Sequence, residues 1–312
     1  MKFGSAKTHR GLMVILTAVL AVLLSVIALA EGEHGEVIDS GECGDNLTWT
    51  LYESIDGVSP RQLEISGTGD MYDYDRFSNT PWYNYIRRET ISIILNHGIT
   101  SIGDYAFDYD NRENERYGLS GSLKIPDTVL SIGDCAFGGC RALTGSLTIG
   151  DRVISIGNGA FMECTGFTGS LTIGNSVESI GNSAFYGCNG LTGNLKIPDS
   201  VVSIGNSAFS HCSGFTGSLK IPENTTSIEG FAFSGCSGFN GILTIGNSVT
   251  TIGENAFRNC SGFTGDLILP ENLMTIGTYA FTGCTGLTGT LNVPESVSRA
   301  STSVSYAIDG FR

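Results

Sequence analysis

The chain has 312 residues, 43 of them glycine, and a formal net charge of −14 at pH 7. A protein this acidic is repelled by nucleic acid and by anionic lipid, which argues against both as partners. Only 15% of the residues are charged, and together with the glycine content this favours a repetitive architecture over an ordinary two-layer domain.

Residues 1–30 have the layout of a secretory signal peptide. Lys2, Lys7 and Arg10 precede an apolar run over residues 11–30, which ends in the small-residue sequence ALA. We therefore expect an extracellular protein, either secreted or held at the cell surface. The same run is long enough to cross a bilayer if it stays uncleaved, and the sequence predicts membrane contact only in that case.

Residues 31–91 are expected to form an N-terminal flank or cap that contains β-structure. The alternating sequences LTWTL (residues 47–51) and QLEIS (residues 62–66) predict two strands. A turn-rich segment follows, with Trp82, Tyr83 and Tyr85. We expect these aromatic side chains to cover the first coil of the repeats, because the end of a repeat array has to be capped.

Seven 24-residue repeats occupy residues 122–289 without a gap. A divergent first repeat with a six-residue insertion precedes them over residues 92–121, and a partial repeat with the C-terminal tail follows over residues 290–312. One phenylalanine recurs in every full copy: Phe137, Phe161, Phe185, Phe209, Phe233, Phe257 and Phe281.

Each repeat predicts three short elements. Leu-x-Ile alternates as a strand with one buried face, and Pro or Gly ends it. Val-x-x-Ile-Gly predicts a second short strand, ended at a turn by a glycine, which can take positive φ. Ala-Phe-x-x-Cys has the spacing of one helical or 3₁₀ turn. The predicted fold is a repeat solenoid of parallel β-sheet coils with short helical or 3₁₀ turns, in which a coil is stable only among its neighbours.

The repeat resembles a known family. The string IPDSVVSIGNSAFSHC over residues 197–212 is similar to the BspA-like subfamily of leucine-rich repeats, and CGDNLTWTL over residues 43–51 resembles the flank that precedes such repeats in exported bacterial proteins. The resemblance implies a leucine-rich-repeat-like solenoid. It also implies a secreted or surface protein that binds host proteins, extracellular matrix or neighbouring cells, and it does not imply catalysis.

One cysteine per repeat forms a ladder through the array. Neighbouring members are close enough for a disulfide, but parallel side chains in register point the same way, and free cysteine packs well as a small buried hydrophobe. We therefore favour an inert ladder, with occasional bridging left open. Cys43 and Cys135 lie outside the ladder, and their pairing across the cap is a further alternative. The ladder is Cys140, Cys164, Cys188, Cys212, Cys236, Cys260 and Cys284.

The sequence predicts no enzyme, no cofactor and no metal site. His211 precedes Cys212, but its repeat position is variable, which disfavours a Cys/His nucleophile pair. Acidic clusters at residues 70–76 and 108–115 lack the spacing of a calcium loop, and we interpret them as solvated loops in preference to calcium ligands.

Candidate ligand-binding residues lie on the outward column of the Leu-x-Ile strand. Because solenoids commonly bind with their extended sheet face, we predict a ligand there, while a merely solvated strand is the alternative. The acidic insertion at residues 108–117 is a second candidate. The predicted binding column is Lys124, Thr148, Thr172, Lys196, Lys220 and Thr244.

These observations favour an exported protein-binding or adhesion module at the bacterial cell surface or in the medium. The expected partner is a protein of the host surface, of the extracellular matrix or of a neighbouring cell. The near-identity of the repeats leaves one alternative, a structural spacer or self-assembling surface-layer component.

Overall fold

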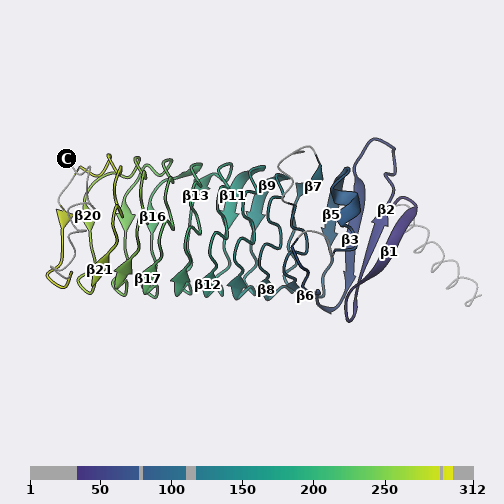
Figure 1. Cartoon of the computed structure of the whole chain (residues 1–312), viewed down its shortest axis with the longest axis horizontal. Coiled ribbons are helices and arrows are strands. Elements are labelled where there is room, and N and C mark those ends of the chain that lie inside the picture. Colours follow the sequence, from purple (N-terminus) through teal and green to yellow (C-terminus); the bar gives the residue numbers. More distant parts are fainter. Residues whose placement is uncertain (1–33, 77–79, 110–116, 289–290, 298–312) are drawn as a thin grey trace, which may run out of the picture.

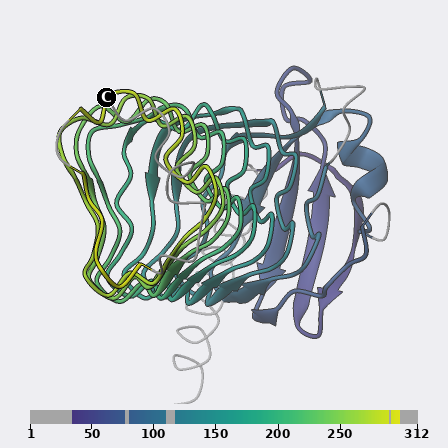
Figure 2. The ribbon, with the colours of Figure 1, turned by 60° about the vertical axis from the view of Figure 1, so that its left-hand side comes forward.

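The computed structural model describes residues 34–76, 80–109, 117–288 and 291–297. Figure 1 shows an elongated molecule in which an N-terminal cap is followed by a row of stacked coils, and Figure 2 shows these coils nested one behind another. The repeat-solenoid fold class is therefore confirmed.

The cap is an antiparallel meander of three strands, β1 (Val37–Gly44), β2 (Leu47–Tyr52) and β3 (Arg61–Gly67). The two strands predicted from LTWTL and QLEIS correspond to β2 and β3. Strand β3 pairs in parallel with β5 (Thr90–Leu95), so the cap and the first coils share one sheet. The short helix α2 (Tyr83–Ile86) lies between β4 (Gly69–Asp70) and β5.

One continuous parallel sheet follows the whole array, and the second strand of each repeat builds it. Nine strands pair in register in this sheet, so that Ser155 lies opposite Ser179 and Ile156 opposite Ile180. The sheet contains β4, β6 (Ile99–Ile102), β8 (Ser131–Ile132), β10 (Ser155–Ile156), β12 (Ser179–Ile180), β14 (Ser203–Ile204), β17 (Ser227–Ile228), β19 (Thr251–Ile252) and β21 (Thr275–Ile276).

The opposite side of the coils carries an interrupted sheet. The Leu-x-Ile strands form this sheet. The extended sheet face expected there is not continuous, because pairing beyond β11 breaks into two-stranded pieces. In Figure 1 the labels β9, β11, β13 and β16 follow one side of the molecule, and β8, β12 and β17 follow the other. The remaining strands are β7 (Gly118–Ser122), β9 (Ala142–Thr148), β11 (Phe167–Thr172), β13 (Gly193–Asn194), β15 (Phe215–Thr216), β16 (Leu219–Lys220), β18 (Leu243–Thr244), β20 (Leu267–Ile268) and β22 (Leu291–Asn292).

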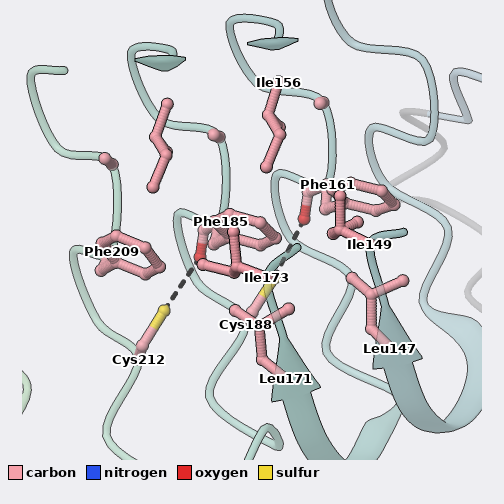
Figure 3. Packing of buried hydrophobic residues seen from close by; sticks show 14 of the residues in the cluster. Leu147, Ile149, Ile156, Phe161, Leu171, Ile173, Phe185, Cys188, Phe209 and Cys212 are labelled. Atoms are coloured by element: carbon pink, nitrogen blue, oxygen red, sulfur yellow. Dashed lines mark hydrogen bonds between the residues drawn. The ribbon is translucent and has the colours of Figure 1, made fainter. Parts of the chain in front are cut away.

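A ladder of stacked aromatic rings runs along the core between the two sheets. Phe161 and Phe185 lie 5.5 Å apart between ring centroids, and Phe185 and Phe209 lie 5.2 Å apart (Figure 3). At the cap, Trp82 stacks on Phe107 at 5.2 Å, and its indole N–H donates to the carbonyl oxygen of Ala106 at 2.8 Å. Trp82 therefore covers the first coil, as the sequence predicts.

The Ala-Phe-x-x-Cys segment was expected to form one helical or 3₁₀ turn, and its hydrogen bonds join residues three apart, as in a 3₁₀ turn. The N–H of Ala184 bonds to the carbonyl oxygen of Gly181, and the N–H of Cys188 bonds to that of Phe185. The residue before the alanine takes a left-handed conformation, with φ of 54° at Ser183 and 56° at Ser207. A left-handed residue in every copy keeps these turns from joining into a continuous helix.

The glycine that closes the second strand has a different role from the one expected. Gly181 is not at positive φ. A Cβ atom there would lie 2.6 Å from the backbone nitrogen of Asn158 in the preceding coil, so the glycine permits close stacking. The fifth copy has Glu229 at this position, and its N–H reaches the carbonyl oxygen of Ile204 at 3.3 Å, compared with 2.9 Å for Gly205 and Ile180.

Candidate binding surface

The predicted binding column lies on the outer surface of the interrupted sheet. Within one strand Leu171 and Ile173 are buried while Thr172 between them is exposed, because successive strand residues point to opposite faces. Pairing keeps the column in register, with Thr172 opposite Thr148 and Lys220 opposite Thr244. All six side chains are exposed: Lys124, Thr148, Thr172, Lys196, Lys220 and Thr244.

A shallow hollow of about 480 Å³ lies over the middle of this column. Lys196, Lys220 and Thr244 line it together with Asp199 and Ile242. The hollow brings half of the predicted residues together, and Lys124 does not line it. Ile242 is 54% exposed, and its combination with two lysines gives the hollow both apolar and cationic groups. Ile242 was not among the predicted binding residues, although an isoleucine in a repeat column that is mostly serine was the available signal.

Acidic residues of a neighbouring column offset the charge of the lysines. The Nζ atom of Lys220 lies 3.6 Å from a carboxylate oxygen of Asp199, and both side chains are well exposed, so the pair adds little stability. The predicted binding column is therefore not a continuous basic surface. The acidic members of that column are Asp127, Asp151, Asp199, Glu223 and Glu271.

The cysteine ladder is buried and hydrogen-bonded. In Figure 3 the thiols of Cys188 and Cys212 point to the carbonyl oxygens of Phe161 and Phe185 in the preceding coils, each at 3.0 Å. Loss of solvent on burial raises the pKa of Cys188 and of Cys236 to about 12, which suppresses the reactive thiolate. The structure thus supports packing as the role of the ladder.

Cys43 and Cys135 are both free thiols in the structure, so the alternative of a bond between them was wrong. Burial raises the pKa of Cys43 to about 12.

The structure separates His211 from the thiol of Cys212. His211 is exposed on a turn with φ of 62°, and its ring packs against Tyr186 at 5.6 Å, whereas Cys212 is buried with its sulfur directed to Phe185. The two residues are adjacent in sequence, but the His211 side chain faces solvent and the Cys212 side chain faces the core. This arrangement does not form a nucleophile pair.

The acidic segments are only partly within the described residues. Residues 110–116 of the insertion lie outside them, so the second binding candidate stays a prediction.

Between the two acidic segments, the carboxylate of Asp104 accepts the N–H of Asp134 in the next coil at 2.6 Å, and burial raises the pKa of the Asp104 carboxyl group. Among the described residues, no three His, Cys, Asp or Glu side chains are grouped to hold a metal ion.

Residues 1–30 also lie outside the part of the chain that the structure describes, so the signal peptide stays a prediction. Over the described ranges, no helix combines the length and the apolar character needed to span a bilayer.

Comparison with known proteins places the repeats in a family. The model of the BspA type leucine-rich repeat region matches residues 116–213 and 192–307. No curated protein matches the chain.

Among solved structures, a leucine-rich repeat protein from Eubacterium ventriosum is 22% identical, with 89% of this chain and 77% of that chain covered and a TM-score of 0.45. A leucine-rich cell surface protein from Faecalibacterium prausnitzii is 19% identical, with 88% and 94% covered and a TM-score of 0.42. The family matches together span more than half of the sequence. The chain belongs to the BspA-type leucine-rich repeat family.

Proposed function

We propose that this protein is an exported binding module that captures a protein ligand with the outer face of its interrupted sheet and performs no catalysis. The observation that carries the proposal is the hollow over Lys196, Lys220 and Thr244, since it groups exposed cationic, hydroxyl and apolar side chains on a rigid array. Polar groups around an apolar contact are the usual composition of a protein-binding surface.

The ligand would lie on the outer surface of the interrupted sheet, opposite the continuous nine-stranded sheet. Ile242 and Ile268, 54% and 71% exposed, continue the surface toward the C-terminal coils. Aliphatic side chains exposed in neighbouring coils offer area that a partner can bury. The lysines then orient an acidic partner, and they do so more strongly at low salt.

A pull-down tests the proposal directly. Purified protein is immobilised and incubated separately with host extracellular matrix proteins and with envelope proteins of the producing cell. A variant with Lys196→Glu and Lys220→Glu serves as the matched bait, because both side chains are exposed and the fold should not change. We expect a protein that the wild type retains and the variant does not. Equal retention by both baits would contradict the proposed face.

A further inference from the structure

A second surface departs from the repeat pattern at the turn before the buried alanine. This position is left-handed in the full repeats, and small or flexible residues occupy it in several of them, such as Gly159, Ser183 and Ser207. Two of the full repeats place a bulky aromatic there, Phe231 with φ of 58° and Tyr279 with φ of 60°, and the divergent first repeat has Tyr105 at the same turn.

The two aromatics combine backbone strain with exposure. A bulky residue in the left-handed region costs of order 1 kcal/mol or more, which glycine would avoid. Phe231 and Tyr279 are nevertheless 37% and 40% exposed, so burial in the core does not account for the choice of residue. Backbone strain at residues that do not pack fully in the core is often found at binding sites.

The solenoid fixes the spacing of the two rings. Phe231 belongs to the fifth repeat and Tyr279 to the seventh. In these coils the buried ladder advances 5.3 Å from Phe233 to Phe257 and 5.2 Å from Phe257 to Phe281. Two coils therefore separate the exposed positions by roughly 10 Å, twice the parallel strand spacing.

Polar groups in the coil between them are held in place. Asn255 is only 2% exposed, its amide nitrogen donates to Glu254 at 3.0 Å, and its amide oxygen accepts from Arg258 at 3.3 Å. The guanidinium of Arg258 also lies 5.9 Å from the centre of the Tyr279 ring. A buried amide thus orients one exposed carboxylate and one exposed guanidinium between the two aromatic positions.

We infer that this ridge, formed by Phe231, Glu254, Asn255, Arg258 and Tyr279, binds an extended, uncharged polysaccharide of β-1,4-linked pyranose units. Aromatic rings pack against the apolar C–H faces of pyranoses, and the two-coil spacing is comparable with the rise of two such units. Fixed carboxylate and guanidinium groups suit hydroxyl groups, which both donate and accept hydrogen bonds. Their charges oppose each other, which favours a neutral ligand over a charged one.

Affinity electrophoresis of the purified protein tests the ridge with two soluble neutral probes, hydroxyethylcellulose for β-1,4-glucose and glycol chitin for β-1,4-N-acetylglucosamine. The variants Phe231→Ser and Tyr279→Ser each introduce the residue found at Ser183 and Ser207, so they should fold at least as well as the wild type. The matched control is Tyr105→Ser, which changes an aromatic at the same turn, φ 53°, far along the array.

We expect at least one probe to retard the wild type and the Tyr105 variant equally, and to bind each ridge variant about tenfold more weakly, the loss that one aromatic contact accounts for. If neither probe retards the wild type, or if the ridge variants are retarded as strongly, the inference is overturned. If neither probe binds and Phe231→Ser also loses a protein that the wild type captures, the ridge is assigned to a protein partner instead.

Discussion

The thiol of Cys188 donates a hydrogen bond of 3.0 Å to the carbonyl oxygen of Phe161 in the preceding coil. Both residues are fully buried, and the same carbonyl group also accepts the backbone N–H of Cys164 at 3.2 Å. The same bond recurs from Cys164 to Phe137 and from Cys236 to Phe209. The cysteine of each repeat therefore joins neighbouring coils as well as filling space.

Replacing Cys188 by alanine should lower the free energy of unfolding by about 1–2 kcal/mol, because the change removes buried volume and one of the two donors to the Phe161 carbonyl, leaving only the backbone N–H of Cys164. Urea denaturation followed by circular dichroism measures the loss. Thr172→Ala, at an exposed position of the same repeat, is the control and should stay within about 0.5 kcal/mol of the wild type. Equal stability of the two variants would contradict the role given to the thiol.

The ladder cysteines should resist modification until the protein unfolds. Burial raises the pKa of Cys164 and Cys212 well above the ordinary value, so neither the access nor the thiolate that a disulfide reagent needs is present. Half-buried Cys135 should react first in the native protein. In denaturant without reductant all nine cysteines should titrate with a thiol reagent. A count below nine would reveal a disulfide.

Alkaline pH should destabilise the solenoid through the same thiols. The pKa of Cys188 is about 12 in the folded protein against 9.0 for an ordinary thiol, so above pH 9 the unfolded chain releases a proton that the native state retains. Its contribution to stability is complete below pH 9 and falls by about 1 kcal/mol by pH 10. Unfolding curves at pH 7.5 and 10 should therefore show a smaller loss for Cys188→Ala than for the wild type. An identical loss in both would contradict the assignment.

Glycines of the coil should differ in their tolerance of a methyl group. At Gly181 a Cβ atom meets backbone atoms of the preceding coil at 2.6 Å, whereas at Gly193, with φ of 79°, it meets nothing within 4 Å. Gly193→Ala should cost about 1 kcal/mol for its left-handed backbone alone. Gly181→Ala should cost about 2–3 kcal/mol, because two coils must separate. Thermal unfolding of both variants decides, and the reverse order would contradict the account of coil stacking.

The period of the repeat was sufficient to predict the solenoid, because the buried positions of Leu171, Ile173 and Phe185 follow from apolar residues that recur every 24 positions. It was not sufficient to predict the turn at Ser183, since a left-handed residue leaves no apolar signature. The role of Gly181 also depends on the distance between coils, which one copy alone does not contain.

The binding column was predicted as a column, and the structure exposes all of its members. The hollow over Lys196 and Lys220 was not predictable, because residues of neighbouring coils line it together, among them Ile242 from the next coil. Pairing of short strands in a solenoid is decided between coils rather than within a repeat.

The most direct measurement compares the affinity of a captured protein ligand for the wild type and for a variant with Lys124→Glu, Lys196→Glu and Lys220→Glu. Titration calorimetry at low salt gives both dissociation constants, and far-ultraviolet circular dichroism checks that the fold is the same. If the ligand binds through the lysines of the binding column, the variant should bind at least about tenfold more weakly than the wild type. Its circular dichroism spectrum should be unchanged. Equal affinities with equal spectra would contradict binding through these lysines.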